Sequence, residues 1–256
     1  MTVKTRIEKR SEFNDWFDSE YAKQYLGSEQ AYLKNALRQV SGPRVLQLGN
    51  VIDSKMIEEV DFPQLIVADI DRSEREASLL ADPAFLPIEH NLMSTIIVPH
   101  VLERHKLPHQ VLREVHRVLM PEGHIILTGF NPISCLGLQR FLYRTAVCPG
   151  NYITVKRVSD WLQLLGFEII GSANFQYSPL VNSLRLRKCF NFLNSVGDRW
   201  LPLLGGGYII TARKKQMAST LIGESPLLRK VSVKKRNRKL ISASSNKKET
   251  INQNYK

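Results

Sequence analysis

Short apolar runs alternate along this chain with segments whose apolar residues recur at helical spacing. This alternation constrains the fold more than any other feature of the sequence. Four runs have the length and composition of strands buried on both faces, at residues 44–49, 64–70, 94–99 and 124–130. The segment between the last two carries apolar residues at helical spacing, namely Val111, Leu112, Val115, Val118 and Leu119. Alternating strands and helices predict an α/β fold with a mostly parallel sheet and helices on both faces.

Start and stop signals support further elements on either side of these runs. A helix is expected over residues 29–40, because Ser41-Gly42-Pro43 follows it, and another over residues 54–60, capped by Asp53 or Ser54. Downstream, Ser159 is a candidate helix cap and Gly166 a candidate helix stop. Two further strands are expected after that stop, at residues 167–173 and 205–215.

The length of 256 residues and the hydrophobic content of 43% suit one well-buried domain with appendages. We expect an N-terminal segment (1–28), a domain (29–212) with an inserted lid (177–204), and a basic tail (213–256). The tail holds 13 Lys/Arg and two Glu, whereas the remaining 212 residues hold 23 basic and 22 acidic residues. The tail therefore carries +11 of the net charge of +12, and its composition predicts disorder.

Composition also limits the compartment and the chemistry. No apolar run reaches the roughly 20 residues of a membrane helix, and the first residues carry charges where a signal peptide needs an apolar core. A cytoplasmic protein is expected. Cys135, Cys148 and Cys189 lie far apart without a CxxC pair, so neither a disulfide framework nor a zinc site is predicted.

The insertion mixes basic and apolar side chains, with Arg185, Arg187 and Lys188 among leucines and phenylalanines. Three interpretations follow: a cap on a substrate pocket, a site for an anionic substrate, or a membrane-surface segment. An amphipathic lid packed on the domain is the interpretation that we favour. The tail supplies phosphate-neutralising charge with one aromatic residue, so it predicts solvated disorder or salt-sensitive contact with RNA or anionic lipid.

Residues 81–132 resemble the middle of class I S-adenosylmethionine-dependent methyltransferases, in particular the methyltransferase type 11 group. The matching residues follow the family order: Asp82, Leu86-Pro87, His100-Val101-Leu102-Glu103, Pro108, Leu112, Glu114, Arg117-Val118-Leu119, Pro121, Gly123 and Asn131-Pro132. Residues 129–141 and the basic ending also resemble a bacterial branch whose first loop reads Leu-Gly-Asn. The resemblance covers about residues 30–213. It implies a Rossmann-like class I methyltransferase fold, with seven strands in the order 3-2-1-4-5-7-6 and the last strand antiparallel.

The resemblance also implies S-adenosylmethionine as cofactor, bound across the carboxyl ends of the first strands. Asp69 matches the acid that accepts hydrogen bonds from the ribose hydroxyls, with Asp71 as its substitute, and Asp82 matches the acceptor of the adenine amine. The residues implied in cofactor binding are Gln47, Gly49, Asn50, Asp69, Ile70, Asp82, Pro83 and Pro99.

The first loop departs from the family pattern of an acid followed by Gly-x-Gly-x-Gly. Gln47 replaces the acid, and Val51 and Asp53 replace two glycines. Val51 is poorly suited to positive φ, whereas Asn50 tolerates it. Gln47 lacks a charge for the ligand's ammonium, and Asp53 as a helix cap would repel its carboxylate, at a combined cost of about 2–3 kcal/mol or about 30- to 150-fold in affinity.

All six histidines fall between residues 90 and 124. No metal site is predicted, because Pro108 interrupts the helical interval between His105 and His109. His100 follows the fourth strand at the mouth of the predicted site and is the one histidine placed to act as a general base. It could equally be a packing residue within the His-Val-Leu-Glu pattern.

Two functions follow. The first is an S-adenosylmethionine-dependent methyltransferase whose unknown small-molecule or macromolecular acceptor enters beside His100, Asn131 and residues 177–204. An Asn-Pro-Pro-Tyr-type tetrapeptide is missing after the fourth strand, which argues against a nucleobase or glutamine acceptor. The alternative is a catalytically inactive scaffold of the same fold, whose basic tail contacts RNA or an anionic membrane. A dehydrogenase is disfavoured because its glycine fingerprint is absent.

Overall fold

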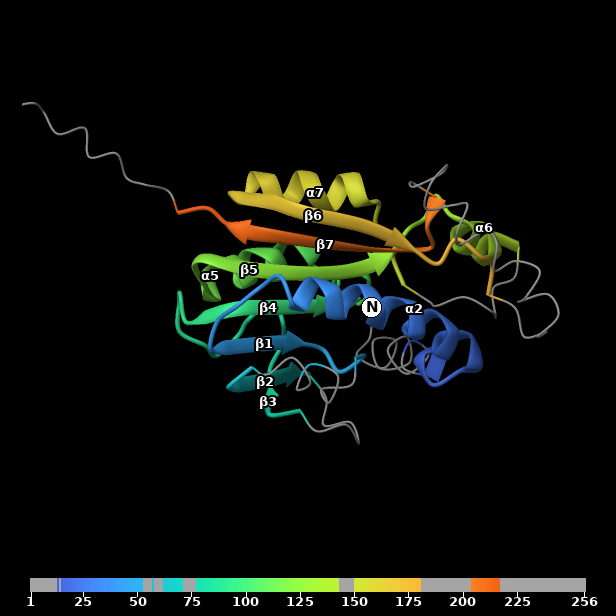
Figure 1. The fold of residues 1–256 in the computed structure, drawn as a ribbon. Coiled ribbons are helices and arrows are strands. Elements are labelled where there is room, and N and C mark those ends of the chain that lie inside the picture. The colour runs from blue at the N-terminus through green and yellow to red at the C-terminus, as the bar shows by residue number, and fades with distance from the viewer. Residues whose placement is uncertain are drawn as a thin grey trace, which may run out of the picture. The chain divides into compact units, whose positions relative to one another are not determined.

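The computed structural model describes residues 13, 15–52, 57, 62–70, 77–142, 150–180 and 204–216. These residues build one seven-stranded sheet in the order β3-β2-β1-β4-β5-β7-β6 (Figure 1), which confirms the predicted order. The strands are β1 (Arg44–Leu48), β2 (Gln64–Asp69), β3 (Leu79–Leu80), β4 (Met93–Pro99), β5 (Leu119–Phe130), β6 (Phe167–Phe175) and β7 (Gly207–Lys214). The helices are α2 (Glu20–Leu37), α4 (Val101–Arg104), α5 (Pro108–Val118), α6 (Cys135–Leu142) and α7 (Val155–Leu164).

Strand direction follows the predicted pattern. β1 pairs in parallel with both β2 and β4, and β4 pairs in parallel with β5. β7 runs antiparallel between β5 and β6. The fold is therefore the class I methyltransferase fold that the sequence predicted.

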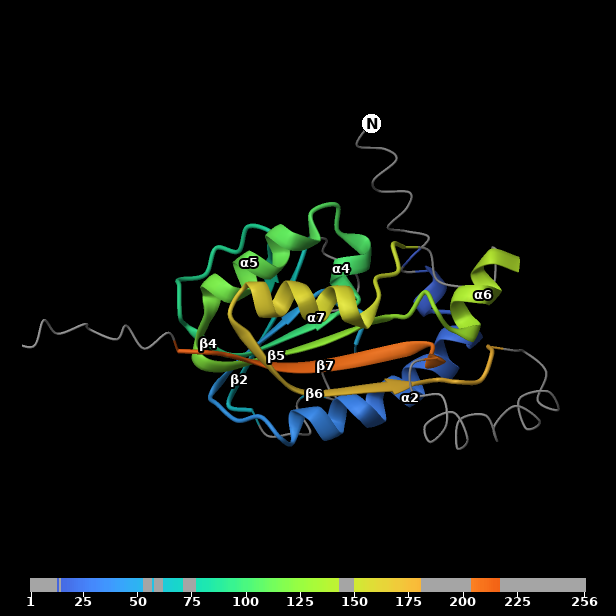
Figure 2. The same cartoon turned by 90° about the horizontal axis from the view of Figure 1, so that it is seen from above.

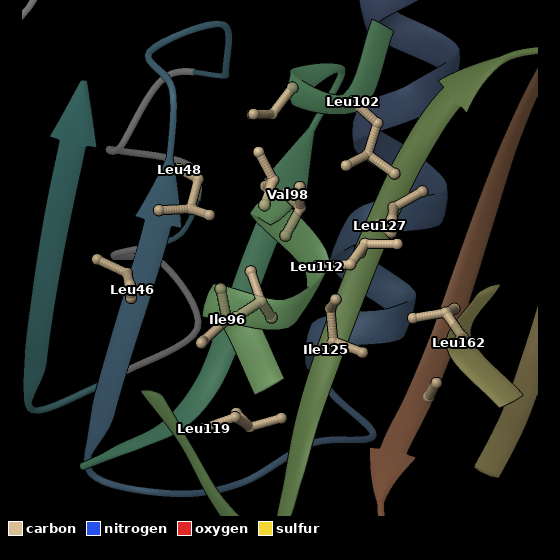
Figure 3. Close-up of a cluster of buried hydrophobic side chains, with 14 of the residues drawn as sticks. Leu46, Leu48, Ile96, Val98, Leu102, Leu112, Leu119, Ile125, Leu127 and Leu162 are labelled. Carbon is tan, nitrogen blue, oxygen red and sulfur yellow. The ribbon is translucent and has the colours of Figure 1, made fainter. Parts of the chain in front are cut away.

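Helices cover both faces of the sheet. In Figure 2, α4, α5 and α7 lie on one face and α2 on the other. Successive residues of each buried strand point to opposite faces, so Leu46, Ile96 and Ile125 enter the core under α5 and α7, as Figure 3 shows. Their sequence neighbours Val45, Ile97 and Ile126 enter the core under α2. This double burial explains the continuous apolar runs.

The N-terminal part of the domain differs from the prediction. The boundary expected between residues 28 and 29 falls inside α2, which begins after Ser19, whose hydroxyl accepts a hydrogen bond from the Ala22 amide at 3.2 Å. Upstream of this helix, Phe13, Trp16 and Phe17 belong to the core under α2. α2 begins at Glu20, nine residues before the start of the predicted helix at residue 29. Periodicity therefore located only the second half of this helix.

The positions of three short elements, β3, α4 and α6, were not predicted from the residues, because each offers too few residues for a periodic signal; the resemblance implied a third strand without its bounds. β5 begins at Leu119 rather than at residue 124, so the Pro121–Gly123 turn lies within the strand as an irregularity with Glu122 at φ 61°. The helix over residues 54–60 and its caps Asp53 or Ser54, Asp71, most of the insertion and residues 217–256 lie outside the described residues. In the part that is described, no helix is long and apolar enough to span a membrane.

Helix α7 has a different cap from the one predicted. Thr154 has extended backbone, and its hydroxyl accepts a hydrogen bond from the Arg157 amide at 3.3 Å. Ser159 lies inside the helix, so its assignment as the cap was wrong. Gly166 follows the helix at φ 86°, which confirms it as the stop.

We therefore predict that Thr154→Ala lowers the free energy of unfolding by about 1 kcal/mol, because it removes the cap. Ser159→Ala is the matched control and changes that free energy by less than about 0.5 kcal/mol, since alanine is a good helix former. Urea titration of the two variants measures both values. Equal losses would contradict the assignment of the cap.

Candidate functional site

The sheet reverses its strand order at β1, whose neighbours are β2 on one side and β4 on the other. In open α/β sheets, ligands bind at the carboxyl ends of the strands where such a reversal occurs. Gly49 follows β1, Ile70 follows β2, His100 follows β4 and Asn131 follows β5. The fold thus brings the predicted site residues to one edge of the sheet.

The loop after β1 turns at Gly49. Its φ is 77°, and within residues 44–52, all of which are described, it is the single residue with positive φ. A Cβ on Gly49 would lie 2.5 Å from Nη2 of Arg104. Neither Asn50 nor Val51 takes the left-handed conformation, so the loop needs one glycine where the family pattern has several.

Gln47 holds this loop from inside the protein. Its side chain is fully buried, and Nε2 donates hydrogen bonds to the carbonyl oxygens of Gly49 (3.0 Å) and Ile52 (2.9 Å). An acid at position 47 would have no proton for these carbonyls, which gives a physical reason for the amide. Oε1 of Gln47 has no hydrogen-bond partner among the described residues, so a buried acceptor remains beside the loop.

Asp69 joins the ends of β1 and β2. Its Oδ2 accepts a hydrogen bond from the Asn50 amide at 3.0 Å, and its Oδ1 accepts one from the Ile70 amide at 2.6 Å. The Gly49 amide donates to the carbonyl of Ala68 at 2.7 Å. The carboxylate therefore lies at the turn, as the resemblance implies, and its contact with a ribose stays a prediction.

Asp82 lies in the turn that follows β3. Its Oδ1 accepts a hydrogen bond from the Ala84 amide at 2.9 Å and lies 3.0 Å from Nε2 of His105. Since Nδ1 of His105 accepts from the Leu107 amide, Nε2 carries the proton and donates to Asp82. Pro83 is buried in the same turn. The role of these residues in adenine binding remains a prediction.

A buried ionic cluster of Glu29, His100 and Glu103 lies at the end of β4. Nδ1 of His100 is 2.8 Å from Oε2 of Glu103, and Nε2 is 3.2 Å from Oε1 of Glu29. The other oxygen of Glu103 accepts a short hydrogen bond from the Phe130 amide. The three side chains come from α2, from the end of β4 and from α4, so the cluster connects helices on both faces of the sheet.

Charge determines the protonation of this cluster. Burial by itself would lower the pKa of His100, but the charges of Glu29 and Glu103 outweigh it and raise that pKa to about 9. Burial also raises the pKa of Glu103, against the opposing effect of His100. The raised pKa values of His100 and Glu103 both favour the protonated form of the side chain. The reason is that two carboxylates and one imidazolium would leave a net negative charge inside the protein.

Of the two roles that the sequence left open for His100, a general base and a packing residue, its surroundings favour the second. Its side chain is 0% exposed, and the rings of Phe17, Tyr25 and Phe130 lie with their centroids 5.5, 5.7 and 4.2 Å from its own. Its raised pKa favours the imidazolium at neutral pH, and an imidazolium has no lone pair to accept a proton. The sequence placed it correctly after β4, but could not show that the N-terminal aromatic residues close over it.

Sequence reasoning missed the two carboxylates, although one signal was present. Ala22, Tyr25, Glu29 and Leu33 follow one another at spacings of three or four residues, so Glu29 occupies a position on the buried stripe of α2. A charged residue on such a stripe requires a buried partner. Among the described residues, no group of His, Cys, Asp and Glu could hold a metal ion.

A pocket of about 310 Å³ lies beyond the carboxyl end of β5. It is lined by Pro132, Gly137, Arg140, Gly150, Asn151 and Tyr152. Asn131 is not among these residues: its side-chain amide donates to the Gly205 carbonyl at 3.1 Å, and its Oδ1 accepts from the Ile133 amide at 3.1 Å. The pocket lies on the side of the site where the acceptor was predicted to enter.

Comparisons with known proteins agree with this geometry. Residues 50–127 match the family model described as a methyltransferase domain. The chain is 28% identical over 213 residues to the uncharacterised protein YafS of Escherichia coli (strain K12), an alignment that covers 80% of this chain and 82% of YafS.

Two solved structures share the fold. The putative methyltransferase in complex with the Haloferax volcanii Trm112 methyltransferase activator aligns with a TM-score of 0.55 at 12% identity, over 80% of this chain and 98% of that chain. A Thermotoga maritima S-adenosylmethionine-dependent methyltransferase, described as a possible histamine N-methyltransferase, aligns with a TM-score of 0.54 at 15% identity, over 80% and 99%. At these identities the likeness establishes the fold.

We predict that Gln47→Glu lowers the free energy of unfolding by about 2–4 kcal/mol, because two buried carbonyls lose their donor and a carboxylate is buried beside them. Gln39→Glu, at an exposed position after α2, is the control and changes it by less than about 0.5 kcal/mol. Urea unfolding measures both. A Gln47→Glu protein as stable as the wild type would show that the amide does not hold the loop.

The ionic cluster predicts a loss of stability at alkaline pH. A folded-state pKa of His100 near 9 lies above its ordinary value of 6.5, so its contribution is complete below pH 6.5 and is lost as the pH rises through 9. The total is on the order of 3 kcal/mol. Urea unfolding between pH 6 and pH 9.5 measures it.

Glu29→Gln removes one of the two carboxylates and should shift this loss to lower pH and reduce its size. The exposed Glu20, on the same helix, provides the control, since Glu20→Gln leaves the cluster intact. Identical pH profiles for the wild type and Glu29→Gln would refute the pairing of Glu29 with a charged His100.

Proposed function

We propose that this protein is an S-adenosylmethionine-dependent methyltransferase. The observation that carries the proposal is the turn at the strand reversal, where Gly49 turns the chain at φ 77° and Asp69 places a carboxylate against the Asn50 amide. The match to a methyltransferase domain over residues 50–127 begins directly after Gly49, includes Asn50 and Asp69, and supports the same function. The acceptor is proposed only as a molecule that enters at the carboxyl end of β5.

The residues present fit the cofactor. Asp69 and Asp82 would hold its nucleoside, and Ile70, Pro83 and Pro99 border the same edge of the sheet. Oε1 of Gln47 is a buried acceptor without a partner among the described residues, which suits the cofactor's ammonium group as a neutral substitute for an acid. When bound, S-adenosylmethionine supplies an electrophilic methyl group on a sulfonium.

The chain's own residues contribute positioning and the exclusion of water. Trp16 and Phe17 pack on Phe130, with Trp16 edge-on at 5.5 Å between ring centroids, and shield the end of β5 from solvent. His100 does not take part as a base, because it is protonated and buried. Transfer to an acceptor that is already nucleophilic needs no strong base, since orientation supplies most of the rate enhancement.

The alternative proposal is an inactive scaffold of the same fold, in which residues 213–256 contact RNA or anionic lipid. Two features favour it: Gln47 in place of the family's acid, and the guanidinium of Arg104 beside Gly49. The two proposals differ in cofactor binding, because only the first requires it.

We predict that isothermal titration with S-adenosylmethionine and S-adenosylhomocysteine gives micromolar binding to the wild type. Asp69→Ala should weaken it by about 2–4 kcal/mol, or about 30- to 1,000-fold, because charge-assisted hydrogen bonds to the ribose are lost. Asp69→Asn, which keeps the shape of the side chain, should also bind weakly.

Asp160→Ala is the control, since Asp160 is an exposed acid on α7. It should bind like the wild type, and thermal unfolding establishes that each variant is folded. Absence of heat at millimolar ligand with a folded wild type would exclude the methyltransferase and leave the scaffold.

A further inference from the structure

Among the described residues, the pocket beyond β5 has one ionised side chain in its lining. Of the six described residues that line it, Arg140 alone carries a charge. Among the described residues, no carboxylate forms an ion pair with this guanidinium. The Arg140 side chain is half-buried and lines the pocket, so its charge is available to a ligand there. A pocket of this kind favours an anionic ligand.

The guanidinium of Arg140 lies over the ring of Tyr152. Cζ of Arg140 lies 4.5 Å from the centroid of the Tyr152 ring, a cation–π arrangement. A guanidinium that lies over a ring directs its N–H donors sideways, in its own plane, where one carboxylate or phosphate can accept two of them. The tyrosine therefore prepares Arg140 for an oxyanion instead of competing for its donors.

Ring contacts connect this pocket to the end of β4. Tyr152 stacks on Phe130 with centroids 5.0 Å apart and an interplanar angle of 24°, and Phe130 lies 4.2 Å from His100. Next to Tyr152, the Asn151 amide donates to the carbonyl of Glu103 at 3.0 Å. Two independent contacts thus hold the pocket against the edge where Gly49 and Asp69 lie.

α6 positions Arg140 from the other side. Its first turn is closed by Ser134, whose hydroxyl accepts from the Gly137 amide at 3.1 Å. The side chain of Gln139 donates a hydrogen bond to the Leu180 carbonyl and accepts one from the Leu180 amide, both at 3.1 Å. A Cβ on Gly137 would lie 2.0 Å from the Pro132 carbonyl oxygen, so the helix approaches the pocket wall closely. Arg140 is therefore held at a fixed place.

We infer that this pocket binds the anionic group of the methyl acceptor, a carboxylate or a phosphate monoester, through the guanidinium of Arg140. The acceptor role rests on the proposed methyltransferase function, whereas binding of an oxyanion does not. Arg140 orients the acceptor and takes no part in bond making.

The test uses small probes on the full chain. Phenyl phosphate and benzoate carry the two oxyanions on the same ring, and benzamide is their neutral counterpart. Isothermal titration should show binding of at least one oxyanion and none of benzamide. Arg140→Gln should weaken that binding about tenfold or more, because two charge-assisted hydrogen bonds are lost. The affinity of Arg140→Lys should lie between those of the wild type and Arg140→Gln, because lysine keeps the charge but not the planar pair of donors.

Arg157 provides a matched control. Its Cζ lies 5.1 Å from the Trp161 centroid on α7, so it repeats the arginine-on-ring arrangement away from the pocket. Arg157→Gln should bind the probes like the wild type. The basic residues of 213–256 are the same in every variant, so their contribution cancels in the comparison. Equal binding by Arg140→Gln and the wild type, or binding of benzamide as strong as that of benzoate, would overturn the inference.

Titration with S-adenosylhomocysteine in the same samples separates this inference from the proposed function. Cofactor binding that survives in Arg140→Gln while oxyanion binding is lost supports both. A wild type that binds the cofactor and neither oxyanion overturns the inference alone. A wild type that binds an oxyanion through Arg140 and no cofactor overturns the acceptor role together with the methyltransferase.

Discussion

The pairing of one buried imidazolium with two buried carboxylates is the interaction on which the rest of this structure depends. Glu29, His100 and Glu103 are buried, so their charges are compensated by one another and by the Phe130 amide that donates to Glu103. Removing one partner would leave an unpaired charge in the interior, which typically costs several kcal/mol. The cluster therefore links α2 to the end of β4. Through this link, α2, whose first half was predicted to belong to a separate N-terminal segment, is part of the domain.

This attachment determines the shape of the candidate site. Because α2 is held at the carboxyl edge of the sheet, the aromatic residues that precede it pack over His100 and Phe130 and exclude water there. The loop after β1 is stabilised separately, by the amide of Gln47 and by a single glycine. A loop that has lost most of the family's glycines can thus still make its turn, since other side chains supply what backbone freedom supplies elsewhere.

The sequence predicted the features that arise from repetition and missed those that arise from single contacts. Continuous apolar runs and the resemblance gave the strand order and the helices on both faces. The helix cap at Thr154 depends on one hydrogen bond, and the role of Glu29 depends on one ion pair. The turn after β1 depends on the positive φ of one residue, Gly49. Such single contacts leave no periodic pattern in the sequence. His100 lies at the end of β4 as predicted, but its burial could not be predicted, because it is produced by residues about 75 to 87 positions earlier in the chain.

The protonation state of His100 is the measurement that tests this account most directly. Nitrogen chemical shifts of its ring, followed by NMR from pH 6 to pH 10, distinguish an imidazolium from a neutral imidazole. The account predicts a charged ring at pH 7.5 that titrates near pH 9, as the two carboxylates require. A ring that is neutral at pH 7.5 would contradict it, since the cluster would then be no ionic link between α2 and the end of β4.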